Sequence, residues 1–258
     1  MSDTAHLGRR VFLAVSCGGL LLLGALSPAA AGCKDAPSPS VDWSECEKTR
    51  LMFNSADLSN GTFVQTFFSS SDLESANLSG ADLSLAELTN ARLAGANLAG
   101  AALEKAVATR ADFSDADLSG ADLSAAELRR SSFQRAKLVG ADLSNSEMNR
   151  SDFTDADLTG ATMARAELAR IVLTGAVLSG VTFSYSNLAR ADLRNANLED
   201  ADLTGSYLFL TVIEGADLSR TKGLTDAQVA IACGSAETQL PSGLNPPQNW
   251  PCPAYHDE

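Results

Sequence analysis

The residue type at every fifth position is the feature that most constrains how this chain can fold. From Phe53 to Leu218 all 34 positions at this spacing are apolar, and Ala108 is the smallest of them. Two residues before each of them, from 56 to 216, 22 of 33 positions are Ala and six are Ser. A period of five fits neither an α-helix nor a β-strand, but it suits a chain that turns after each short extended piece. The pattern predicts an all-β solenoid.

A second period of 20 residues predicts how the solenoid is built. Phe113, Phe133 and Phe153 are spaced by 20, and charges of opposite sign alternate at the same spacing in Asp72, Arg92 and Asp112. Residues stacked on adjacent coils are expected to resemble one another, so four five-residue sides should form one square coil. Residues 53–220 then make about eight coils, and with about 4.8 Å between neighbouring strands the rod is about 40 Å long.

Uninterrupted five-residue units such as those in 116–125 (ADLSG, ADLSA) resemble the pentapeptide repeat family, whose unit reads A-[D/N]-L-x-x. The resemblance covers 53 to about 220. It implies a right-handed quadrilateral β-helix whose interior is filled by the central Leu or Phe and by the smaller Ala or Ser. It also implies one function to be considered, because some members imitate the shape and charge of duplex DNA and bind DNA gyrase.

Residues 1–31 are predicted to be a secretory signal peptide. Arg9 and Arg10 precede an apolar run at 11–26, and Ala29 and Ala31 complete an A-x-A cleavage pattern. The run is shorter than the roughly 20 residues of a membrane span. The arginine pair also resembles a twin-arginine signal, so either the Sec or the twin-arginine route leads to the periplasm or the exterior. A lipoprotein modified at Cys33 is the weaker alternative, because Leu is absent three positions earlier.

The segments that flank the repeat are expected to cap its apolar ends. Residues 32–52 are assigned to an N-terminal cap, and 221–258 to a C-terminal cap with a Pro-rich tail. Thr225 and Gln228 have the spacing of a capping box, which predicts a short helix at about 226–233. Four cysteines remain after signal removal, and an even count in an exported chain favours disulfides. Because the rod separates its ends, we expect the local pairs Cys33–Cys46 and Cys233–Cys252.

One surface column could contact a partner. Five arginines spaced by 20 lie on the same side of the square as three glutamates at that spacing; these are Arg110, Arg130, Arg150, Arg170, Arg190, Glu127, Glu147 and Glu167. The arginines could bind an anionic partner, or the glutamates could neutralise them. The second interpretation is favoured, since stacked arginines without acids would repel one another. The stacked pair Asp122 and Asp142 could bind a divalent cation, although two solvated carboxylates explain it more simply.

Composition and motifs favour a binding role over catalysis. The net charge of −13 argues against non-specific nucleic-acid binding. Only two histidines are present, and no nucleophile motif, zinc spacing or phosphate-binding loop occurs. We therefore expect no enzyme activity, no cofactor, no metal and no stable membrane insertion after signal cleavage. The predicted function is a non-enzymatic extracytoplasmic scaffold that contacts an unidentified protein. The alternative is a DNA mimic that binds DNA gyrase, as in some cytoplasmic family members.

Overall fold

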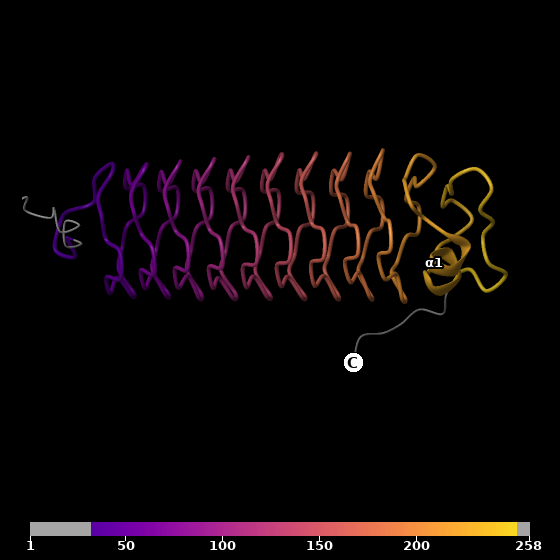
Figure 1. Ribbon diagram of the computed structural model, residues 1–258, viewed down its shortest axis with the longest axis horizontal. Coiled ribbons are helices and arrows are strands. Elements are labelled where there is room, and N and C mark those ends of the chain that lie inside the picture. The colour runs from indigo at the N-terminus through magenta and orange to yellow at the C-terminus, as the bar shows by residue number, and fades with distance from the viewer. Residues whose placement is uncertain (1–31, 252–258) are drawn as a thin grey trace, which may run out of the picture. The chain divides into compact units, whose positions relative to one another are not determined.

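The computed structural model describes residues 32–251, and these form a regular solenoid from Val41 onward (Figure 1). Each side of a coil carries one isolated parallel β-bridge to the residue 20 positions later, as in Asp42↔Thr62 and Asp202↔Lys222. The bridges recur every five residues, so each coil has four sides. Coils run from 41 to 220, which makes nine, and the structure forms bridges instead of extended strands.

Each five-residue side has the same local structure, seen for instance in 121–125. Asp122, at the outward position, makes the bridge, and Leu123 at the centre position points inward. The amide of Ala126 donates to the carbonyl of Leu123 across a tight turn. Ala125, at the second turn position, has φ 55°. Such a turn, with positive φ at its third residue, has the form of a type II turn. The polar residues between the centres thus supply the corners of the square.

The interior is filled as the repeat pattern predicts. All centre-position residues from Phe53 to Leu218 are buried, and the small residues two positions earlier are nearly all buried with them. Phe113, Phe133 and Phe153 stack inside the solenoid with ring centroids 4.8 and 4.4 Å apart and nearly parallel planes. These three rings are core residues, as expected from their place in the repeat.

The first coil begins at Val41, within the segment that the sequence assigned to an N-terminal cap. Trp43 is fully buried at a centre position and packs against Phe53 and Phe63. Lys48 occupies the next centre position, where its ammonium lies 3.6 Å from the centre of the Trp43 ring and donates to the carbonyl of Cys33. Burial lowers the pKa of Lys48, partly offset by Asp35. Because Trp and Lys replace the usual centre residues, the repeat pattern hides this coil.

A loop at 32–40 is tied to the first coil by the expected disulfide Cys33–Cys46, with Cα atoms 5.4 Å apart. Cys46 is buried at the small position of its side. The second expected pair includes Cys252, which lies outside the described residues, as does the predicted signal peptide. Within 32–251, no helix is long and apolar enough to cross a membrane.

The predicted C-terminal helix is confirmed, and it ends slightly earlier than expected. α1 spans Asp226–Ile231, and Thr225 and Gln228 form the capping box. The Gln228 side-chain amide also donates to the carbonyls of Leu203 and Ser206 in the preceding coil. After α1 the chain returns to the solenoid through the bridges Val212↔Cys233 and Asp217↔Gln239. The helix and this return cover the last coil (Figure 1).

Candidate functional site: an unpaired arginine column

Five arginines occupy one corner of five successive coils: Arg110, Arg130, Arg150, Arg170 and Arg190, called here the arginine column. Each lies at the second turn position, with φ between 58° and 63°. Four are exposed and Arg170 is half-buried. Hydrogen-bonded neighbours in adjacent coils lie about 4.8 Å apart. The backbone therefore presents five guanidinium groups in a line along the solenoid.

The glutamates that were expected to neutralise this column have other partners. Arg129, at the turn position before Arg130, forms ion pairs with both Glu127 and Glu147. Glu167 accepts a hydrogen bond of 2.9 Å from the side-chain amide of Asn187. The structure therefore does not support the interpretation that the glutamates neutralise the arginine column.

The aspartates that follow the column along the chain are also engaged elsewhere. Asp112 accepts from the amide of Ser114. Asp152 accepts from Gln134 and from Thr154, and Asp192 pairs with Arg194. Across residues 32–251, no ion pair within 4.0 Å and no side-chain hydrogen bond involves a guanidinium of the arginine column.

Arginines elsewhere in the same solenoid show what pairing looks like. Arg135 is bound in a bidentate manner by Asp115 of the preceding coil, with both N–O distances below 3 Å. This hydrogen bond holds the pKa of Asp115 below its usual range. Arg92 forms ion pairs with two acids, Asp72 at 3.5 Å and Glu74 at 2.6 Å. Stacked opposite charges therefore neutralise one another at these columns, whereas no acid within 32–251 pairs with the arginine column.

The stacked pair Asp122 and Asp142 lacks the properties of a cation site. Asp122 and Asp142 stack as predicted, but each carboxylate accepts from a serine amide of its own side. Within the described residues, no group of three or more His, Cys, Asp or Glu could hold a metal ion.

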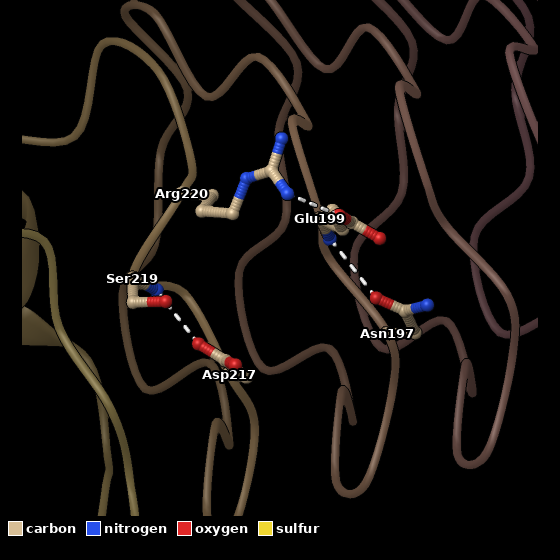
Figure 2. Close-up of a pocket in the computed structure, with 5 residues that line it drawn as sticks. All are labelled: Asn197, Glu199, Asp217, Ser219 and Arg220. Carbon is tan, nitrogen blue, oxygen red and sulfur yellow. Dashed lines mark hydrogen bonds and ion pairs between the residues drawn. The ribbon is translucent and has the colours of Figure 1, made fainter.

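A shallow depression of about 220 Å³ lies near the C-terminal end (Figure 2). Its five lining residues are Asn197, Glu199, Asp217, Ser219 and Arg220. Glu199 and Asp200 both pair with Arg220, and the Asp217 carboxylate accepts from the amide of Ser219. These contacts occupy the polar groups that could otherwise bind a ligand.

The repeat analysis missed an exposed aromatic row on the last two coils, formed by Tyr185, Tyr207 and Phe209. Their exposed fractions are 65%, 51% and 40%. Tyr207 and Phe209 have nearly parallel rings with centroids 6.1 Å apart. Tyr207 takes the outward position and Phe209 the first turn position, where other coils mostly carry small or polar residues. Reading the outward columns separately from the core positions would have found this departure.

Comparisons with known proteins agree with the repeat pattern. The family model for pentapeptide repeats matches eight copies, in segments that begin with 53–90 and end with 186–222. A search of curated proteins found no match. HetL, a pentapeptide repeat protein involved in heterocyst differentiation regulation in the cyanobacterium Nostoc sp. strain PCC 7120, is 30% identical. The match covers 71% of this chain and 89% of HetL, with a TM-score of 0.46.

Two further solved structures are similar over parts of the chain. A pentapeptide repeat protein from the thylakoid lumen of Arabidopsis thaliana is 32% identical over 40% of this chain and 74% of its own, with a TM-score of 0.35. QnrB1, a plasmid-mediated fluoroquinolone resistance protein, is 20% identical over 76% of this chain and 88% of its own, with a TM-score of 0.42. With its repeat units matched across most of the nine coils, the chain belongs to the pentapeptide repeat family.

Proposed function

We propose that this protein is a non-enzymatic, extracytoplasmic interaction scaffold whose arginine column holds an anionic partner. The observation that carries the proposal is the lack of ion pairs at the column, in a solenoid that pairs other arginines such as Arg135 with acids. An unpaired line of like charges attracts an opposite charge and steers its approach. The negative remainder of the surface would repel anions that approach elsewhere.

The construction of the coil supports a scaffold role. Ladder hydrogen bonds join each coil to the next, as in the Leu118 amide to the Lys137 carbonyl at 2.7 Å. Centre and small positions form the core, so nearly all side chains that meet solvent stand at the outward and turn positions. No insertion interrupts the five-residue register between 53 and 218. The right-handed sense that the family implies for the coil is part of this proposal.

The extracytoplasmic location is supported by the signal-like segment and by cysteine chemistry. Disulfides persist in oxidising compartments, and Cys33–Cys46 joins the first residues after the predicted cleavage site to the first coil. A Cys33 bonded to Cys46 has no thiol left for a lipid, which favours a periplasmic or secreted protein over a lipoprotein. The intact mass of the protein from its native host tests this. We expect residues 32–258, lighter by about four protons for two disulfides, and the mass of an uncut, reduced chain would overturn it.

Binding to polyanions tests the column itself. The five column arginines are replaced by Asn, which already occupies the same turn position at Asn90 and Asn145. A matched control removes the same charge from the paired arginines by substitution with Gln, namely Arg92, Arg129, Arg135, Arg194 and Arg220. We expect the wild type and the control to bind poly-L-glutamate at low salt and the column variant to lose binding. Equal binding by all three proteins, or none by the wild type to poly-L-glutamate, dextran sulfate or single-stranded DNA, would contradict the proposal.

The DNA-mimic alternative makes a different prediction. The acidic composition permits it, but the arginine column interrupts any continuous negative surface. A gyrase supercoiling assay with the protein lacking 1–31 separates the two functions. We expect no effect at micromolar concentrations, and inhibition or protection of gyrase would favour the alternative.

A further inference from the structure

The aromatic row lies at the C-terminal end of the arginine column, on the adjoining side. The amide of Arg190, the last arginine of the column, donates to the carbonyl of Phe209 at 2.8 Å. Tyr207 makes the bridge to Asn187 in the coil below. The column and the row are therefore parts of one continuous surface that spans six coils.

The ring of Tyr185 extends this surface across the side of Tyr207 to the corner at the end opposite the arginine column. A Cβ built on Gly205 would lie 2.7 Å from two carbons of that ring, so the ring lies over a glycine turn. Beneath Phe209 the corresponding residues of the two preceding coils are Ala189 and Ala169. Because Ala169 and Ala189 carry only methyl groups, little side-chain volume projects from the surface beside the last arginines. The larger side chains of Tyr207 and Phe209 project further in the last coil, where they can bury apolar groups of a partner.

This combination is the composition of a protein-binding surface. Tyr, Phe and Arg are enriched at protein interfaces, and exposed aromatic side chains supply most of the binding free energy when a partner covers them. Charged side chains around such an anchor mainly set orientation and association rate. The arginine column thus accounts for steering, and the aromatic row for a short apolar contact at one end.

The spacing of the column selects the shape of the partner. Five arginines at about 4.8 Å intervals span about 19 Å. An α-helix with one acid per turn repeats every 5.4 Å and spans about 22 Å over the same five charges. Same-face residues of an extended strand repeat at about 6.7 Å and span about 27 Å. Phosphates of one strand of duplex DNA advance about 3.4 Å each and span only about 14 Å. The span of the α-helix differs least from that of the arginine column, and flexible arginine side chains can accommodate this difference.

We infer that the partner is a protein that lays an acidic α-helix along the arginine column and inserts apolar side chains at one end of that helix against the aromatic row. This inference rests on the proposed function, since it names the chemistry of the anionic partner. It commits to one acidic residue per helical turn on the docking face, followed within about one turn, or roughly 5 Å, by Leu-like residues.

A pair of stapled helical peptides provides the test. The first carries five Glu on one face, one per turn, followed by two Leu, and a second version has the two Leu before the Glu. The control peptide has the same composition with the Glu distributed around the helix. The affinity of each peptide for the protein lacking 1–31 is measured by fluorescence anisotropy. We expect one patterned peptide to bind at least about tenfold more tightly than the control peptide.

Protein variants test the aromatic row. Tyr207→Asn with Phe209→Ala copies Asn187 and Ala189 of the coil below, so the backbone should be retained, as far-UV circular dichroism can verify. We expect this double variant to weaken binding of the patterned peptide at least about tenfold, as a central aromatic anchor does. Val139→Ser, which removes an exposed apolar side chain from another side of the solenoid, should leave the affinity unchanged.

The outcomes separate this inference from the proposed function. Equal affinity for patterned and control peptides, or unchanged affinity of the double variant, overturns the inference. Binding of poly-L-glutamate through the column without any peptide preference overturns it while the proposed function stands. Tighter binding of an acidic polysaccharide, lost in the double variant, assigns the surface to a different class of partner. If no polyanion binds, both this inference and the proposed function are overturned.

Discussion

The turn conformation at the corners predicts that adding a methyl group at a corner glycine destabilises the fold, whereas removing the methyl group of a corner alanine stabilises it. Gly140 and Ala125 both occupy the second turn position, with φ 67° and 55°. A Cβ built on Gly140 meets no atom within 4 Å. Gly140→Ala should therefore act through backbone conformation alone, and Ala125→Gly is its reciprocal.

The magnitude follows from two opposing contributions. A non-glycine residue in the left-handed region costs about 1–2 kcal/mol. Ala in place of Gly lowers the entropy of the unfolded chain, which offsets about 0.4–1 kcal/mol. Gly140→Ala should thus lower the free energy of unfolding by about 0.8 kcal/mol, and Ala125→Gly should raise it by a similar amount. For a chain of this size each change shifts Tm by about 2–3 °C in opposite directions.

Urea denaturation of the three proteins in parallel checks this pair of predictions. Because repeat proteins depart from two-state unfolding, the comparison is made only where the denaturant slopes agree. A stabilising Gly140→Ala, or two variants that shift stability in the same direction, would refute the assignment of the corners to a left-handed turn residue.

The core, the disulfide and the half-buried Asp192 give further predictions. Phe133→Ala should lower the free energy of unfolding by about 3–5 kcal/mol, and Phe133→Leu by less, since Leu fills the same position in other coils; equal urea midpoints for the two would contradict the stacked-core description. Removing Cys33–Cys46 by Cys33→Ser with Cys46→Ala should cost about 3 kcal/mol and speed amide exchange at 41–52, and unchanged exchange there would show that the loop does not hold the first coil. Burial alone would raise the pKa of Asp192, but hydrogen bonds from Arg194 outweigh it and lower that pKa. Asp192 therefore stabilises the fold above its unfolded pKa of about 3.9, and this is lost as pH falls through the lower folded value; between pH 5 and 2 the urea midpoint should fall less in Asp192→Asn than in the wild type.

The core of this fold could be predicted from sequence because each core position recurs at a constant interval. The five-residue period separates inward from outward residues, and the 20-residue period assigns residues to stacked columns. The first coil escaped this reasoning because Lys48 stands at a centre position. Its stem fills the interior while its ammonium reaches the loop at Cys33, a solution that no apolar pattern reveals.

The pairing of charges that stand at different positions of a side could not be predicted in the same way. Sequence spacing places Glu127 and Glu147 on the side that carries Arg130, and charge balance alone suggests that they pair. Which of two consecutive arginines reaches the acids depends on the turn geometry. Arg129, at the first turn position, contacts both glutamates, whereas Arg130 lies one residue further around the corner in a left-handed conformation. Position in the turn is not sufficient, because Arg135 occupies the same second turn position and pairs with Asp115, which is stacked on it. Arg130 stays unpaired because the residues stacked on it, Arg110 and Arg150, are also arginines.

The residue type that is stacked within a column therefore decides whether the charges of that column are neutralised. Residues at the outward position face their stacked neighbours directly, so alternating signs there neutralise one another, as Arg92 and Asp72 do. Residues at the second turn position also pair with their stacked neighbours, as Arg135 and Asp115 do, so a corner column made only of arginines keeps its charge. Corner residues lie outside both the core and the bridges. A contact surface built at a corner therefore leaves the core and the bridges unchanged, and the affinity for a partner can be altered there without altering the fold. The comparison of the column variant with the paired-arginine variant tests this separation, because both lose five charges and only one should lose its partner.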